Sequence, residues 1–385
     1  MKYKLEELIE LKTQGVNTTT DNIEYVLHGH KIVQAKNIQP YNITFDDKNF
    51  VSEETYKKMK YNHKLHKGDI LYTNIGSQLG NSAIYNSDEE AIITWNVMKL
   101  IPKKQIITND FLCYLLNYYK ADIVSLNSSS TMPFVSGKEL MNFEFEVPSL
   151  LIQNKVTKIL KTIEHKIKLN AQTNDNLFKM MKIKFEDWIT NLNKYEVSSL
   201  SKIANYTNGL AMQKFRPKDN EESLPVIKIK EMNDGITENT ERCSTNIKDE
   251  VIINNGDVLF AWSGTLCMSI WGKGKAGLNQ HIFKVTSDKY PKWFYYFWTL
   301  KHLNKFKMIA AGKATTMGHI KRGELDISEV LIPEDKELQE MHKIMQPLFN
   351  KYINNLIQNE TLTQLRDTLL PKLMNGEIDL DKIEN

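Results

Sequence analysis

Cysteine is scarce in this sequence of 385 residues, which contains only Cys113, Cys243 and Cys267. The three lie far apart, their number is odd, and no pair has the Cys-x-x-Cys spacing. Disulfide-stabilised domains and thiolate zinc sites need paired or clustered cysteines, so both classes are excluded. The scarcity is typical of a reducing compartment, and we expect a cytoplasmic protein.

The sequence also lacks a long apolar run and an excess of one charge. No apolar stretch approaches the ~18 residues of a membrane-spanning helix, and the amino terminus has no apolar signal core. Lysines and arginines total 50 against 47 aspartates and glutamates, and this net charge of +3 does not by itself identify a nucleic-acid-binding protein. Hydrophobic residues make up 41% of the chain, enough for the cores of two domains, so we expect a soluble protein without membrane contact.

Motifs that mark common catalytic sites are missing as well. The phosphate-binding loop, the His-Glu-x-x-His helix, the Gly-x-Ser-x-Gly elbow and the Asn/Asp-Pro-Pro-aromatic segment of amino-methyltransferases do not occur. One literal Gly-x-Gly-x-x-Gly lies at 272–277, but the residues after it predict a strand, whereas a dinucleotide site needs a helix there. We therefore predict a glycine-rich hairpin. Histidines and carboxylates show no metal-ligand spacing, so we predict no catalytic residue and no metal site.

What the sequence does contain is a duplication. Residues 130–140 (STMPFVSGKEL) match 315–325 (TTMGHIKRGEL) at a sequence offset of 185. Upstream, 68–72 (GDILY) match 256–260 (GDVLF) at an offset of 188, and 30–38 match 224–232 at 194. The offset grows toward the amino terminus, as expected when loops differ in length while structural elements match. We infer a tandem duplication.

Each copy begins with roughly 140 residues of short alternating runs broken by Gly, Asn and Asp, which are typical of strands and turns. The runs at 257–262 and 281–285 predict strands, and the aromatic segments 111–118 and 293–302 predict buried helices. Asp69 and Asp257 follow glycine in the turn before a strand, where aspartate is favoured for local hydrogen bonding rather than catalysis. The expected fold class is α+β.

Each copy ends with a long helical pattern, which begins after Pro148 and Pro333. Apolar residues recur at spacings of three and four, giving each helix an apolar seam. We expect helices of roughly 30 residues, about 45 Å long, that pair antiparallel as a spacer. The predicted seam consists of Ile159, Ile163, Ile167, Leu177, Ile344, Leu348, Leu356, Leu362, Leu365 and Leu369.

Four asparagines interrupt the seam at matching places, Asn170 and Asn174 in the first helix and Asn355 and Asn359 in the second. A buried asparagine at a helix seam fixes the register of the helices at some cost in stability, whereas a solvated one does not. The sequence leaves both interpretations open.

Basic residues are concentrated locally. Between Val258 and Gly323 there are eleven lysines and arginines and one acidic residue, and between His28 and Lys67 there are eight lysines and four acidic residues. This bias favours a nucleic-acid partner, because cations neutralise phosphates, and polar loop residues are candidates for base contacts; a solvated basic face is the alternative. The DNA-binding candidates are Lys36, Asn37, Thr73, Asn74, Ser77, Ser130, Thr131, Lys230, Ser263, Thr265, Lys273, Lys275, Gln280, His281, Thr315, Thr316, Lys321 and Arg322.

The order globule, long helix, globule, long helix resembles the DNA-specificity subunit of type I restriction–modification enzymes over essentially the whole chain. The strongest local match is 365–378 (LRDTLLPKLMNGEI), which is similar to that family's carboxy-terminal helix ending. The segment 224–230 (LPVIKIK) and the Pro-then-Gln helix entries, ending at Gln153 and Gln339, are also similar. The first copy departs from the family pattern, with HKIVQAK at 30–36, and the helix entries lack the usual double proline and Glu-Gln pair.

The resemblance implies target recognition domains at 1–148 and 191–333 and spacer helices at 149–190 and 334–378. Each domain would bind one half-site of a bipartite double-stranded DNA target. The chain would hold no cofactor; two partner methyltransferase subunits would bind S-adenosylmethionine and methylate adenine, with two restriction subunits as an optional addition. The alternatives are a DNA-binding enzyme with an unrecognised site and a protein-interaction scaffold.

Overall fold

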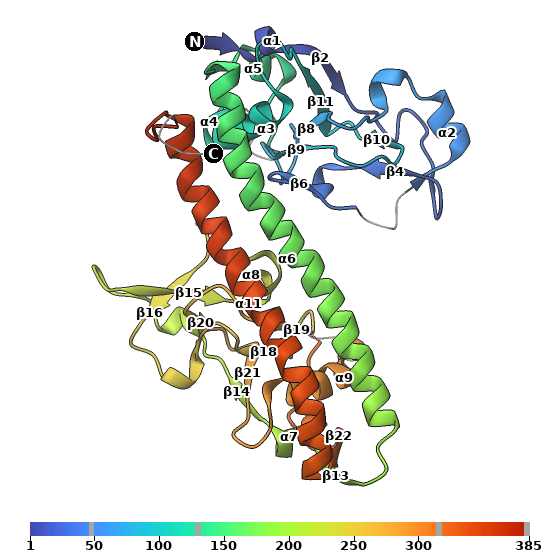
Figure 1. The fold of residues 1–385 in the computed structure, drawn as a ribbon, viewed down its shortest axis with the longest axis vertical. Coiled ribbons are helices and arrows are strands. Elements are labelled where there is room, and N and C mark those ends of the chain that lie inside the picture. Colours follow the sequence, from blue (N-terminus) through green and yellow to red (C-terminus); the bar gives the residue numbers. More distant parts are fainter. Residues whose placement is uncertain (46–49, 128–131, 313–317, 381–385) are drawn as a thin grey trace. The chain divides into compact units, whose positions relative to one another are not determined.

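The computed structural model describes residues 1–45, 50–127, 132–312 and 318–380 (Figure 1). The chain divides into two compact units, residues 1–163 with 366–385 and residues 164–365. Each unit contains one globule and a stretch of both long helices, α6 (Leu150–Thr190) and α11 (Asp335–Met374), drawn in green and red.

The globule of the first unit is built on a four-stranded antiparallel sheet of order β2-β11-β8-β9. A second sheet, β10-β4-β7-β3, contains one parallel pair, β10 with β4, and β1 pairs with β12. The elements are β1 (Lys2–Lys4), α1 (Leu5–Leu8), β2 (Ile9–Gln14), β3 (Tyr25–Val26), β4 (His30–Val33), β5 (Ile38–Gln39), β6 (Asn42–Ile43), β7 (Phe50–Val51), α2 (Glu53–Lys58), β8 (Ile70–Thr73), β9 (Ser82–Ile84), β10 (Ala91–Ile93), β11 (Val97–Pro102), α3 (Asn109–Tyr118), α4 (Lys120–Ser125), α5 (Gly137–Asn142) and β12 (Glu144–Glu146).

The globule of the second unit has a corresponding sheet of order β14-β21-β18-β19, also antiparallel. Its other sheet, β16-β15-β20-β17, again contains one parallel pair, β15 with β20, and β13 pairs with β22. The elements are β13 (Tyr195–Ser199), α7 (Leu200–Ile203), β14 (Asn205–Asn208), β15 (Ser223–Ile227), α8 (Ile229–Asp234), β16 (Arg242–Ser244), β17 (Ile252–Ile253), β18 (Val258–Ala261), β19 (Cys267–Ile270), β20 (Ala276–Leu278), β21 (Ile282–Thr286), α9 (Lys292–Ala311), α10 (Gly323–Asp326) and β22 (Glu329–Pro333).

The duplication holds at the level of strand register. Gln14 of β2 pairs with Met98 of β11, and Asn208 of β14 pairs with Phe283 of β21. The residue numbers of Met98 and Phe283 differ by 185, and those of Gln14 and Asn208 by 194, which are the offsets found in the sequence. The predicted α+β duplication, its strands and its buried helices α3 and α9 are confirmed.

The core of each globule includes side chains of both long helices. In the first unit Val156 and Leu160 of α6 and Leu370 and Leu373 of α11 lie in the main apolar cluster of the globule. In the second unit the aromatic segment 293–298 of α9 is buried in a cluster with residues of α6 and α11, namely Met181, Phe185, Ile189, Met341, Met345 and Phe349. Each globule is therefore anchored to both helices within its own unit by apolar burial.

The long helices exceed the roughly 30 residues that the apolar periodicity predicts. They contain 41 and 40 residues, about 60 Å each, because the predicted seam residues all lie inside the helices and both helices extend beyond them at each end. Two predicted seam residues are wrong: Ile344 and Leu365 are 48% and 44% exposed, and the neighbouring Met345 occupies the buried face. Among the described residues no helix is apolar enough over sufficient length to cross a lipid bilayer.

The four asparagines of the seam form a hydrogen-bonded group, the asparagine quartet. Asn355 Nδ2 donates to Asn174 Oδ1 at 2.9 Å, and Asn170 Nδ2 donates to Asn359 Oδ1 at 2.9 Å. Exchanging the two copies by the offset of 185 maps one pair onto the other, so the group has approximate two-fold symmetry. From one hydrogen-bonded pair to the other, the residue number rises in α6 (170 to 174) and falls in α11 (359 to 355). The two helices therefore pair antiparallel in this unit.

Backbone contacts complete the quartet. Asn174 Nδ2 donates to Tyr352 O at 3.0 Å, and Asn359 Nδ2 donates to Ile167 O at 3.1 Å, again a pair related by the same offset. Asn170, Asn174 and Asn355 are 2%, 5% and 1% exposed, which rules out the solvated interpretation. Buried and satisfied amides favour one pairing of the helices, because another register would leave them unpaired.

The quartet predicts an asymmetry between single and double substitutions. Asn355→Ala should lower the free energy of unfolding by about 1–3 kcal/mol, because it leaves the buried Asn174 Oδ1 without the Asn355 donor. Replacing both with leucine should recover most of that loss, since no buried side-chain amide is then left unsatisfied and Tyr352 O, which loses the Asn174 donor, keeps its hydrogen bond within α11. Thermal melting of the full chain tests this. Asn350→Ala, an exposed asparagine of the same helix, is the control and should change stability by less than about 0.5 kcal/mol. Equal losses in the single and double variants would contradict the interpretation.

Candidate DNA-recognition surfaces

A lysine–aspartate pair, buried in the first copy and half-buried in the second, lies at the start of a central strand. Lys99 Nζ lies 3.3 Å from Asp69 Oδ2 before β8, and Lys284 Nζ lies 3.1 Å from Asp257 Oδ2 before β18. Each aspartate also accepts a backbone N–H of its own turn, and each lysine donates to a backbone carbonyl at 2.7 or 2.8 Å. These bonds confirm that the two aspartates serve the turn. The opposite ends of the same strands carry the polar loops.

In the second unit the loop after β18 is joined to the loop before α10. Gly264 N donates to Gly318 O at 2.8 Å, and Ser263 forms a β-bridge with His319. Gly264 has φ of +71°, a backbone conformation that favours glycine. The loop that follows the central strand is therefore held against residues near the start of α10.

Trp262 is the centre of this surface. Its Nε1 donates to Asn208 Oδ1 at 2.9 Å, and its ring centroid lies 6.1 Å from that of His281 and 6.3 Å from that of His319. Gln280 Nε2 lies 3.2 Å from His281 Nε2, while His281 Nδ1 is buried without a hydrogen-bond partner among the described residues. The set Asn208, Trp262, Ser263, Gln280, His281 and His319 is termed the second rim.

The first unit contains the same arrangement at equivalent positions. Gly76 N donates to Pro133 O at 2.9 Å and Ile75 forms a β-bridge with Phe134, as Gly264 and Ser263 do in the second unit. Gln14 Nε2 donates to Asn74 Oδ1 at 3.0 Å, the counterpart of the Asn208–Trp262 bond. The set Gln14, Asn74, Ile75, Trp95 and Phe134 is termed the first rim.

The predicted DNA-contacting residues divide by exposure. Ser77 and Thr265 are exposed in the equivalent loops, and Lys36 and Lys230 are exposed after the equivalent strands β4 and β15. The buried candidates, between 0% and 5% exposed, are Asn37, Thr73, Asn74 and Ser263. Burial prevents these four from touching a base in this conformation, so they shape the loops instead. Ser130, Thr131, Thr315 and Thr316 lie outside the described residues.

The glycine-rich segment 272–277 does not join the second rim. Val258 at the start of β18 pairs with Ile270, whereas Ala261 at its end pairs with Cys267. The segment follows β19 and therefore lies at the start of β18, while the second rim lies at its end. Lys273 and Lys275 are consequently separated from the candidates of the second rim.

The predicted hairpin at this segment is wrong, although the predicted strand after it is present. Strand β20 begins at Ala276, within the segment. It pairs with β15 and β17 of the other sheet, whereas β19 pairs with β18. The glycine-rich segment therefore connects one sheet to the other. The local sequence does not show whether the strands on either side of it pair with each other or belong to different sheets.

The basic run 258–323 is only partly available to a ligand. Lys284 is paired with Asp257, and Lys292 Nζ donates to Gly256 O at 2.5 Å. Burial lowers the pKa of Lys292, although the nearby Asp257 opposes this shift. Local charge in the sequence therefore overstates the positive charge at the surface of this globule.

Several rim residues were missed by sequence reasoning. Trp95 is 39% exposed in the turn before β11, and Phe134 is 36% exposed. The signal was present, because the offset of 185 places Trp95 opposite Gln280, which is among the predicted candidates. Gln14 and Asn208 are likewise related by the offset of 194, at the carboxyl ends of β2 and β14.

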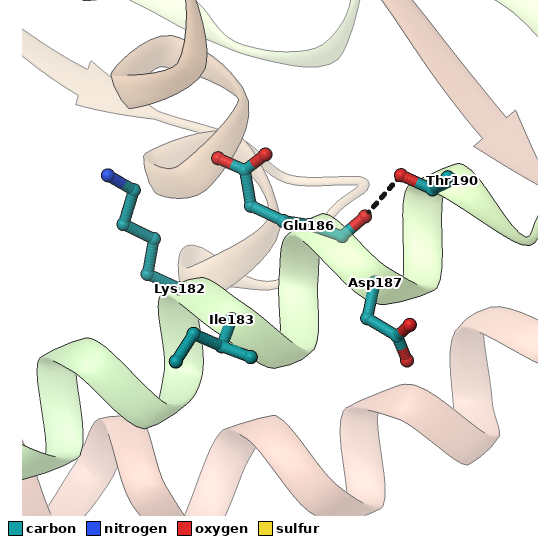
Figure 2. A pocket seen from close by; sticks show the side chains of 5 residues that line it. All are labelled: Lys182, Ile183, Glu186, Asp187 and Thr190. Carbon is teal, nitrogen blue, oxygen red and sulfur yellow. Dashed lines mark hydrogen bonds between the residues drawn. The ribbon is translucent and has the colours of Figure 1, made fainter.

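A shallow hollow lies along α6 in the second unit, and all five of its lining residues come from this helix: Lys182, Ile183, Glu186, Asp187 and Thr190 (Figure 2). Thr190 Oγ1 donates to Glu186 O at 2.7 Å, and a Glu186 carboxylate oxygen lies 3.7 Å from Lys301 Nζ. These side chains contain no nucleophile with an adjacent base. Among the described residues no group of three or more His, Cys, Asp or Glu is placed to hold a metal ion.

Comparison with known proteins connects these surfaces to a family. The family model for the type I restriction modification DNA specificity domain matches residues 1–178 and 193–364, one match for each copy. The chain is similar to the MjaIX specificity subunit of a type I restriction enzyme of Methanocaldococcus jannaschii, with 24% identity over 82% of this chain and 79% of the relative. It is also similar to the HindI specificity subunit of Haemophilus influenzae, with 21% identity over 81% of this chain and 87% of the relative.

A solved structure shares the fold. The crystal structure of the S subunit of a type I restriction–modification system from M. genitalium superposes with a TM-score of 0.56 at 14% identity, covering 97% of this chain and 95% of that chain. Together with the family match to both copies, this identifies the chain as a member of the type I restriction–modification DNA-specificity family.

Proposed function

We propose that the first and second rims each bind one half-site of a bipartite DNA target, and that the chain directs methyltransferase subunits to that target. As a family member the chain supplies DNA sequence specificity and is not itself catalytic. The assignment of each half-site to one rim is our inference.

The observation that carries the proposal is one loop frame built twice with different side chains. The frame consists of equivalent strand ends, β-bridges and loop hydrogen bonds in the two copies. The side chains on this frame differ: Trp95 of the first rim corresponds to Gln280 of the second, and Phe134 corresponds to His319. Aromatic and apolar side chains contact the thymine methyl group, whereas amides and imidazoles exchange hydrogen bonds with base edges. The two half-sites should therefore differ in sequence.

The long helices are proposed to carry the partner subunits. Large apolar side chains remain exposed on them, including Leu169, Ile183 and Ile344, which are 46%, 68% and 48% exposed. Ile183 lies on the hollow shown in Figure 2, beside charged residues of the same helix. Such a surface suits a protein partner. We infer two methyltransferase subunits that bind S-adenosylmethionine, with restriction subunits as an optional addition, in the cytoplasm.

The proposal is tested by reconstitution. The purified chain alone should neither methylate nor cleave DNA, and addition of its methyltransferase subunits should produce methylation confined to one bipartite motif. Methylome sequencing of cells that express the complex identifies the motif. Transfer of methyl groups from S-adenosylmethionine by the chain alone, or methylation without a bipartite motif, would refute the proposal.

A further inference from the structure

Each globule places one basic side chain between the last part of its edge strand and the first part of a short helix. In the first unit Lys12 Nζ of β2 donates to Gly137 O of α5 at 3.4 Å. In the second unit Arg322 Nη2, just before α10, donates to Tyr206 O of β14 at 2.9 Å.

The two contacts are equivalent but reversed. Lys12 pairs with Leu100 in the sheet and Tyr206 pairs with Val285, and the numbers of these two partners differ by 185. Lys12 and Tyr206 therefore occupy the same position. Gly137 and Arg322 are related by the same offset, within the matched segments 130–140 and 315–325. One copy thus supplies the cation from the strand and the other supplies it from the helix side.

The space between the two positions holds one cationic side chain in each copy. A Cβ atom on Gly137 would lie 2.9 Å from Lys12 Nζ, so a side chain there competes with the lysine for the same place. Tyr206 instead points into the core, where its hydroxyl lies 2.6 Å from Thr299 Oγ1. The copies differ in sequence at both positions, yet both retain one positive charge.

The retained cation lies next to each rim. Lys12 is two residues before Gln14 on β2, so it shares a strand face with a residue of the first rim. Arg322 lies over the Phe283 ring, whose centroid is 5.5 Å from that of Trp262 in the second rim. Lys12 and Arg322 are exposed, and within residues 1–45, 50–127, 132–312 and 318–380 neither forms an ion pair. A second lysine accompanies each of them, Lys138 and Lys321.

A purely structural role does not account for the charge. The Lys12–Gly137 contact of 3.4 Å is long for a hydrogen bond, and a neutral amide could make it equally well. The Arg322 guanidinium also lies 5.8 Å from the centre of the Phe283 ring, a contact that leaves its exposed side open. An exposed cation beside a polar surface is suited to a phosphate of bound DNA, which fixes the position of the protein without reading sequence.

We propose that Lys12 and Arg322 are equivalent phosphate-contacting residues that anchor the first and second rims on the DNA backbone. The inference rests on the proposed function, because it requires that both rims bind DNA. Phosphate contacts release counterions, so each such contact adds roughly 0.9 to the slope of log affinity against log salt concentration.

The test measures DNA binding by the complex of the full chain with its methyltransferase subunits. The probes are a duplex carrying the motif assigned by the methylome of the wild type and a duplex with both half-sites scrambled. K12Q and R322Q should each reduce the salt slope by about 1. The factor by which affinity falls between about 50 and 200 mM salt should therefore be about fourfold smaller for each variant than for the wild type. The methylated motif should not change.

A relocation variant makes the test specific. K12Q/G137R places the cation as the second copy does, and it should restore the slope lost in K12Q. Lys103 provides a matched control, since its Nζ donates to Glu7 O at 3.0 Å in the same globule away from the first rim, and K103Q should leave the slope unchanged. Melting temperatures of all variants monitor folding.

The failures of the two proposals are distinguishable. If the wild-type complex binds neither duplex, the proposed function is wrong and this inference with it. If the wild type binds but K12Q keeps the full slope, or weakens binding equally at every salt concentration, only the phosphate assignment is overturned. The phosphate assignment also fails if K12Q loses slope and K12Q/G137R does not regain it while melting normally.

Discussion

Exchanging residues 191–333 for the corresponding globule of another specificity subunit should replace one half of the methylated motif and leave the other half intact. The second rim and its supporting lysine–aspartate pair both lie within this segment. The first rim is built entirely from residues of the other copy. Because no described hydrogen bond within a rim comes from the other globule, the two readouts should be separable.

The exchange must preserve the apolar contacts of the second unit. Helix α9 packs against α6 and α11 through Trp293, Phe297 and Phe349 among others, so a donor that differs there will create cavities or overpacking. A second variant that also carries donor residues at 181–190 and 335–349 controls for this. Methylome sequencing gives the result. A motif changed in both halves, or in neither, would contradict separable recognition, and the reciprocal exchange of 1–148 should alter only the other half.

Lengthening both long helices should widen the gap between the half-sites. Four residues inserted between Ile163 and Glu164, and four between Leu365 and Arg366, add about 6 Å of helix and about 40° of rotation. A base pair of B-DNA rises about 3.4 Å and turns roughly 35°, so the gap should grow by one to two base pairs. The insertion points coincide with the limits of the two compact units, and they leave both cores and the asparagine quartet intact.

An insertion in one helix only is the informative control. It shifts α6 against α11 by about one turn between the core of the first unit and the quartet, so it should reduce stability and methylation rather than change the gap. Good helix formers at the inserted positions avoid a propensity penalty. If the double insertion methylates the original motif with its original gap, the helices do not set the spacing.

The fold could be predicted from the sequence largely because the sequence contains two copies of the same domain. The similar offsets of the GDILY–GDVLF match and of the 130–140 segment locate equivalent elements without knowledge of their structure. Helix length and face are less accessible. Periodicity places a seam only to within one residue, so the pattern points to Ile344 where Met345 is buried. The predicted seam residues lie inside both helices, so the helix length taken from the apolar periodicity is too short.

The candidate surfaces were harder to predict, because the sequence does not tell which end of a strand a loop occupies. Lys273 and His281 are close in the sequence yet lie at opposite ends of β18. Exposure is also inaccessible: Thr73, a predicted contact, is fully buried, whereas Trp95, which the sequence did not single out, is exposed. The equivalence of Lys12 and Arg322 can be recognised only from the structure. An alignment of the two repeats compares Lys12 with Tyr206 and Gly137 with Arg322, so it does not show that the two cations occupy the same place.

The two-fold symmetry of the asparagine quartet has a consequence for how the chain can diverge. Each hydrogen-bonded pair joins one residue of the first copy to one of the second, so a change in either copy is constrained by the other. Among the described residues the rims carry no such link, since the hydrogen bonds of each are made within its own copy. Drift should therefore be slow and correlated in the paired helices but rapid and independent in the rims, and recombination between related genes at the helix ends should generate new specificities from existing halves.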